Sequence, residues 1–139
     1  LLMGDSDIEG WDSEAAFPGS RNVGVGGWTC ANVLSNAPAQ LAQHKPDTVL
    51  LVCGENDLAY GSTAAAAFAS FESIVDTIVG TGARVMYIGT KPEPVTASLH
   101  AAYRDYDALI RALATTLAAE AAARGGSAGT GRQGMCHER

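Results

Sequence analysis

The sequence has few positive charges, few cysteines and no long apolar run. Nine Lys and Arg are spread along the chain against fifteen Asp and Glu, which leaves no basic face for a nucleic acid. No apolar stretch approaches the roughly 18 residues of a membrane-spanning helix. Three cysteines, an odd number at scattered spacings, argue against a disulfide framework and a zinc site. We therefore expect no nucleic-acid partner, no membrane span and no metal, and we interpret Cys30, Cys53 and Cys136 as small apolar residues.

What is present fits one small globular domain. A length of 139 residues is that of a single domain, and 47% apolar against 17% charged residues excludes disorder throughout. The chain begins at Leu1, inside an apolar run, so we expect further residues upstream of it. For that reason the missing targeting segment assigns no compartment, and nothing in the composition indicates an oligomeric state.

Apolar runs alternate with helical patterns along the chain. The expected strands cover residues 1–3, 21–23, 48–53 and 84–89, and the expected helices cover residues 32–44, 64–79 and 98–124. The runs TVLLVC and RVMYIG are continuous, as in strands buried on both faces. Ser62 or Thr63 can cap the second helix, and Pro38 is expected to force a break or a new first turn in the first. This alternation predicts an α/β fold with a mostly parallel sheet between two layers of helices.

The composition changes after Arg124. The remaining residues are rich in glycine and arginine and carry almost no acid. This composition predicts a domain over residues 1–124, followed by a disordered tail over residues 125–139.

Three of the expected strands are followed by polar loops that contain glycine. The loops are GDSD at residues 4–7, GVGGWT at residues 24–29 and GEND at residues 54–57. Open parallel sheets bind their ligands at the carboxyl ends of the strands. We therefore expect these loops to converge on one edge of the sheet.

The three loops resemble the first three sequence blocks of the SGNH, or GDSL-type, serine hydrolases. The blocks GDS, NVGVGGWT and GEND occur in order, and the resemblance covers roughly residues 1–120. It implies the three-layer α/β/α sandwich of that family, which is flavodoxin-like, here incomplete at both ends. It also implies hydrolysis of a small-molecule carboxylic ester without a cofactor.

The resemblance assigns roles to single residues. Ser6 matches the nucleophile, and Gly27 and Asn56 match the oxyanion-hole glycine and amide, with the backbone N–H of Ser6 as a third donor. Asp5 and Asp57 are expected to support the loops through hydrogen bonds. Three apolar residues near the loops are expected either to line the acyl pocket or to belong to the core: Trp28, Leu58 and Ile8.

The same loops also allow other interpretations. Ser6 can cap a helix and Asn56 can occupy a turn, and both alternatives remain open. The glycine loop reads GxGGxT, not the dinucleotide pattern GxGxxG. The acids that begin at Asp5 imitate the start of a calcium-binding loop, but Ala16 stands where a bidentate Glu is required, so calcium is rejected.

The fourth block of the family, D-x-x-H, is not found in this chain. It would supply the catalytic base and the acid that orients it. The residues three positions before His44, His100 and His137 are Leu41, Ala97 and Gly134, and none of them is acidic.

We expect either that the C-terminal part of the family's fold lies outside this sequence or that the pair is truly lost. The chain as given is then a very poor esterase. Two other functions stay open: acyl transfer at the same site, and a non-catalytic module that binds carbohydrate or ester.

Overall fold

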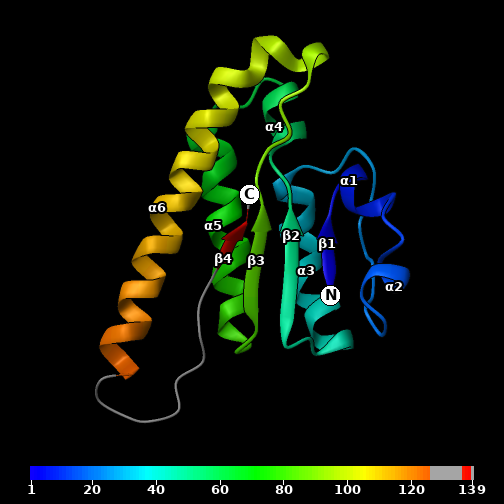
Figure 1. Cartoon of the computed structure of the whole chain (residues 1–139), viewed down its shortest axis with the longest axis vertical. Coiled ribbons are helices and arrows are strands. Elements are labelled where there is room, and N and C mark those ends of the chain that lie inside the picture. The colour runs from blue at the N-terminus through cyan, green and yellow to red at the C-terminus, as the bar shows by residue number, and fades with distance from the viewer. Residues whose placement is uncertain (126–135, 139) are drawn as a thin grey trace.

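The computed structural model describes residues 1–125 and 136–138 of the chain (Figure 1). The strands are β1 (Leu2–Gly4), β2 (Thr48–Val52), β3 (Arg84–Ile88) and β4 (Cys136–Glu138). The helices are α1 (Ser6–Glu9), α2 (Ser13–Ala16), α3 (Cys30–His44), α4 (Glu55–Ala59), α5 (Ala64–Gly80), the 3-10 helix η1 (Pro94–Leu99) and α6 (His100–Gly125). No helix among these residues is long and apolar enough to cross a membrane.

The four strands form one parallel sheet in the order β1-β2-β3-β4. Leu2 is in register with Leu50, and Thr48 is in register with Arg84. The strand expected at residues 21–23 is reduced to one parallel bridge between Asn22 and Leu2, although the chain there still runs along β1. All carboxyl ends therefore meet at one edge, the upper edge of the sheet in Figure 1.

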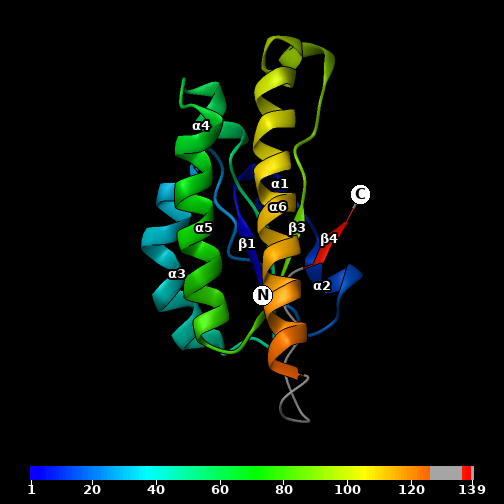
Figure 2. The same ribbon diagram turned by 90° about the vertical axis from the view of Figure 1, so that its left-hand side faces the viewer.

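Helices lie on both sides of this sheet, so the predicted α/β class is confirmed. Figure 2 shows α3 and α5 on one side and the short α2 on the other. The long helix α6 packs against α5 and reaches β4. A parallel sheet needs such cover because its strands are connected by crossovers that pass over its faces.

The main core lies between the sheet and α3, α5 and α6. Alternate residues of β2 and β3 point into it, as the pleat of a strand requires. At its centre the rings of Phe71, Tyr87 and Tyr106 meet edge to face, with centroids of Phe71 and Tyr87 5.0 Å apart. A smaller cluster of Leu2, Ile8 and Val52 lies on the other face. Each such fully buried side chain stabilises the fold by roughly 1.5–3 kcal/mol.

Helix boundaries follow local signals with one exception. The Thr63 side chain accepts a hydrogen bond from the Ala66 N–H and caps α5, one of the two caps predicted. The expected break at Pro38 is wrong, because α3 continues through it. Proline costs this helix one hydrogen bond, but Ala37 and Leu41 on either side are buried against the core, and that burial offsets the loss.

The cysteine interpretation needs correction. Cys30 and Cys53 form a disulfide, with Cα atoms 5.2 Å apart and both residues almost fully buried. They are core residues, as predicted, yet they are also cross-linked. Their separation of 23 residues belongs to no recognisable spacing pattern, so only the fold brings the two sulfur atoms together.

The tail predicted to be disordered lies mostly outside the described residues. Residues 126–135 and 139 are not described, and α6 ends at Gly125. Residues 136–138 are described, and they form β4, which pairs in parallel with β3. This strand was not indicated by the glycine-rich composition.

The disulfide should contribute measurably to stability. Closing a loop of this length removes chain entropy worth about 3 kcal/mol from the unfolded state. We therefore expect the double variant Cys30→Ala/Cys53→Ala to lose about 3 kcal/mol of unfolding free energy in urea titrations monitored by circular dichroism. Cys136→Ala is the matched control. Coincident unfolding curves for the double variant and the wild type would contradict the expectation.

Candidate functional site

The three polar loops lie at the carboxyl edge of the sheet, as the parallel topology requires. Ser6 begins α1 directly beyond β1, and Asn56 lies in α4 directly beyond β2. In Figure 1 both short helices lie above the tips of their strands. The loop that follows β3 reaches the same edge and carries Lys91.

Ser6 is exposed at the start of a single helical turn. The side chain of Asp5 caps this turn by accepting a hydrogen bond from the Asp7 N–H, at 3.1 Å. Asp5 itself is only 3% exposed, and this burial raises the pKa of its carboxyl to about 6. The buried Asp5 thus holds the turn from which the Ser6 side chain reaches solvent.

The glycine-rich loop passes directly beside Ser6. The Val25 N–H donates to the Gly4 carbonyl at 3.0 Å, and the Gly26 N–H donates to the Glu9 carboxylate at 3.0 Å. A Cβ on Gly26 would lie 2.7 Å from that carboxylate and 3.8 Å from the Cβ of Ser6. Gly27 has φ +77°, a left-handed conformation that favours glycine.

The helix α4 is bonded to the same loop. The side-chain amide of Asn56 donates to the Trp28 carbonyl at 2.9 Å, and the Cys30 N–H donates to the Asp57 carboxylate at 2.9 Å. An amide nitrogen carries two hydrogens, and Trp28 takes one of them. The structure thus brings together the segments that carry Ser6, Gly27 and Asn56.

Both carboxylates expected to support the loops make such contacts. Asp5 caps α1, while Asp57 holds the first N–H of α3. Asp57 is 6% exposed, and its burial raises the pKa of the carboxyl, whereas the hydrogen bond from Cys30 acts in the opposite direction.

The residues considered for an acyl pocket are mostly core. Ile8 is fully buried in the smaller cluster and Leu58 is buried in the main one, because the turns of α1 and α4 direct them inward. Trp28 packs partly buried against the main core. Tyr60 is the exposed aromatic at this edge: it is 68% exposed, and its hydroxyl lies 3.7 Å from the position of a Cβ on Gly27. No sequence signal distinguished it.

Two sizeable surface hollows of the described chain lie elsewhere. One of about 550 Å³ lies between the end of α3 and the end of α5, and another of about 500 Å³ lies near Leu1 and Lys45. Both are at the edge where the strands begin. Neither contains Ser6, Gly27 or Asn56, so we place the candidate site by its contacts and not by cavity size.

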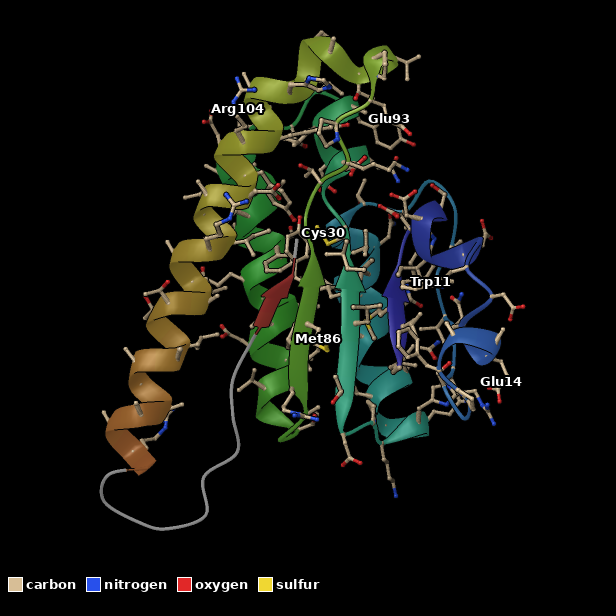
Figure 3. The ribbon with its side chains drawn as sticks, in the orientation of Figure 1. Trp11, Glu14, Cys30, Met86, Glu93 and Arg104 are labelled. Atoms are coloured by element: carbon tan, nitrogen blue, oxygen red, sulfur yellow. A yellow bond between two sulfur atoms is a disulfide. The ribbon has the colours of Figure 1, made fainter. Side chains whose placement is uncertain are left out.

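Sequence reasoning missed the ion pairs that Lys91 forms at the carboxyl edge of the sheet. The Lys91 ammonium lies 2.8 Å from the Asp7 carboxylate and 3.8 Å from that of Glu93, in the loop shown in Figure 3. The hydrogen bond to Asp7 raises the pKa of Lys91. Glu55 accepts from the Lys91 N–H, and burial raises the pKa of Glu55. These contacts connect sequence positions too distant for any pattern to reveal.

The histidines whose side chains are described do not form a base-and-acid pair. His44 lies in the last turn of α3, at the opposite edge of the sheet. The Nε2 atom of His100 lies 2.9 Å from the Glu93 carbonyl and 3.3 Å from the Thr96 hydroxyl. Over residues 1–125 and 136–138, no cluster of His, Cys, Asp and Glu could hold a metal ion.

The sheet and its loops define an α/β protein with one candidate site at the carboxyl edge. Residues 2–127 match the GDSL-like Lipase/Acylhydrolase family, and the chain belongs to this family. The resemblance inferred from the three sequence blocks is thereby confirmed. The comparison with curated proteins found no match.

Solved structures show the same fold. TesA is 24% identical, with a TM-score of 0.66 over 84% of this chain and 73% of that one. AlinE4, an esterase of the SGNH-hydrolase family, is 22% identical, with a TM-score of 0.68 over 84% and 70%. A member of the lipolytic G-D-S-L family from Veillonella parvula is 18% identical, with a TM-score of 0.70 over 83% and 71%.

The raised pKa of Asp5 predicts a pH-dependent stability. A carboxyl whose pKa is higher in the fold than in the unfolded chain adds stability below pH 4, which is lost as the pH rises through about 6. Asp5→Asn keeps the capping acceptor but cannot ionise. From pH 4 to pH 7, we expect its unfolding free energy to gain about 1–3 kcal/mol relative to wild type. A pH-independent difference in urea titrations would refute this; Asp12→Asn, which changes another N-cap, is the control.

Proposed function

We propose that this chain acts on carboxylic esters as a serine hydrolase, with Ser6 as the nucleophile. The observation that carries the proposal is the close approach of Gly26 to Ser6, since a Cβ placed on Gly26 would lie 3.8 Å from the Ser6 Cβ, together with the hydrogen bond from the Asn56 amide to the Trp28 carbonyl of the same loop. These contacts support one site of three polar loops around the exposed Ser6 side chain. Membership of the acylhydrolase family supports the same reaction.

In the proposed reaction the Ser6 hydroxyl attacks the carbonyl carbon of the ester. The carbonyl oxygen becomes an oxyanion, which needs preorganised donors. We assign this role to the backbone N–H groups of Ser6 and Gly27 and to the second hydrogen of the Asn56 amide. Collapse of the tetrahedral intermediate expels the alcohol and leaves an acyl-Ser6 ester, which water then hydrolyses.

The proton of Ser6 must pass to a base, because a serine hydroxyl at its ordinary pKa is a weak nucleophile. Of the described side chains, neither His44 nor His100 contacts a carboxylate that would orient it. Oxyanion donors without a complete triad still leave about 10³- to 10⁴-fold acceleration over water. We therefore propose that the 139-residue chain turns over activated esters slowly.

Variants of the two side chains test this assignment. We expect Ser6→Ala to abolish the enzyme-dependent hydrolysis of p-nitrophenyl acetate, because no acyl-enzyme can form. Asn56→Ala should lower kcat by about 10²- to 10³-fold, the usual effect of losing one oxyanion donor. Stopped-flow and steady-state absorbance of the released phenolate measure both effects.

The controls are a serine and an asparagine on the exposed face of α3. Ser35→Ala and Asn36→Ala remove side chains that bond only within that helix, so they should keep the wild-type rate. A fluorophosphonate probe provides a second readout, since it labels the nucleophile without needing turnover. Turnover or labelling that survives in Ser6→Ala would exclude Ser6 as the nucleophile.

A binding module is the second candidate function, and it is favoured because His100, in the described part of the chain, is hydrogen-bonded to the Glu93 carbonyl and the Thr96 hydroxyl and not to a carboxylate. Such a module would hold an ester or an acylated sugar at the same donors without cleaving it. If it is correct, calorimetry should detect wild-type binding of an acetylated sugar, Asn56→Ala should weaken that binding, and no phenolate should appear above the Ser6→Ala background. Transfer to added methanol, read as methyl ester, would instead reveal an acyltransferase.

A further inference from the structure

The disulfide joins the two segments that carry the proposed oxyanion donors. Cys30 begins α3, directly after the loop that contains Gly27 and Trp28. Cys53 follows β2 and directly precedes α4, which carries Asn56. Figure 3 shows Cys30 near the carboxyl ends of the central strands. The disulfide therefore joins the two donor segments directly, although 23 positions of sequence separate Cys30 from Cys53.

Hydrogen bonds surround the disulfide and connect the same segments. Asp57 of α4 binds the Cys30 N–H, and Asn56 binds the carbonyl of Trp28. From α6, the Tyr106 hydroxyl donates to the Cys53 carbonyl at 2.8 Å and lies 3.4 Å from the Cys30 sulfur. The disulfide and these hydrogen bonds together hold the glycine loop against α4.

Geometry at an oxyanion site has narrow tolerance. Donors must be held within roughly 0.5 Å of the productive position, and a displacement of 1 Å can lower the rate by about 100-fold. The loop of Gly27 has no regular structure of its own, and beside Ser6 it is held by single hydrogen bonds at Val25 and Gly26. A covalent tie at its end limits how far the N–H of Gly27 can move from the amide of Asn56.

We propose that the Cys30–Cys53 disulfide is a positioning element of the oxyanion site, fixing the Gly27 loop against Asn56. Its catalytic consequence rests on the proposed ester hydrolysis, whereas its effect on the loop does not. A dithiol reductant such as dithiothreitol breaks the S–S bond, delivering two electrons and two protons. Two cysteine thiols then form and the reductant becomes a cyclic disulfide. The loop and α4 are afterwards held by hydrogen bonds alone.

The first test measures the loop itself, without reference to catalysis. Amide hydrogen exchange, followed by mass spectrometry, compares the wild type, the reduced wild type and Cys30→Ala/Cys53→Ala. In peptides covering residues 24–29 and 54–58, we expect exchange about tenfold faster than in Ile78→Ala, a variant that also loses stability, whereas α5 should exchange at similar rates in both. Ile78→Ala is the control, since Ile78 is fully buried near the other edge of the sheet and its loss also destabilises the fold.

The second test measures catalysis. For an activated aryl ester, we expect the double variant to lower kcat at least tenfold with KM within twofold of wild type. Ile78→Ala should keep both constants while it is folded, and Cys136→Ala controls for the third thiol. Because a smaller folded fraction also lowers the apparent kcat at constant KM, each kcat is normalised to the folded fraction that circular dichroism measures under the assay conditions.

The outcomes separate the proposal from the proposed function. Unchanged exchange at residues 24–29 after reduction would overturn the positioning role. So would exchange at residues 24–29 and 54–58 that rises no more than exchange in α5 and β3, because the disulfide would then stabilise the whole fold without fixing this loop. If the wild type shows no Ser6-dependent turnover, ester hydrolysis fails, while the exchange data still decide whether the disulfide fixes the loop.

Discussion

Parallel pairing of the strands is the constraint on which the rest of the molecule depends. Because β1, β2 and β3 run in the same direction, every polar loop that follows a strand must emerge at one edge. The buried face of the sheet then fixes the register, since a slip of one residue would turn Val49 and Leu51 away from α3 and α5. The positions of the loops at the candidate site are therefore set by the backbone pairing of the strands and by apolar packing of the sheet.

The sequence predicted well those features that depend on short, regular patterns. Continuous apolar runs located β2 and β3, and the capping signal at Thr63 located the start of α5. The polar loops could be assigned to one edge of the sheet because that assignment requires only that the strands be parallel. The family resemblance followed from the same loops, and it did not require any contact to be known.

Features that depend on distant contacts were not predictable. The disulfide and the ion pair of Lys91 with Asp7 each join residues that no local pattern relates. The exposure of Tyr60 likewise depends on how the fold packs around it. For Ile8 and Leu58 the sequence left pocket and core open, and both side chains are buried in the core clusters.

The charges around Ser6 explain why neutral donors suit this edge. Asp5, Asp7, Glu9 and Glu55 surround the α1 turn, and Lys91, the cation among them, is already bound to Asp7. A further negative charge on a substrate oxygen would be repelled by these carboxylates. An added Lys or Arg would pair with these acids instead of the oxyanion. Backbone N–H groups and an amide cannot be neutralised in this way, so a dipolar oxyanion site is compatible with an acidic surface.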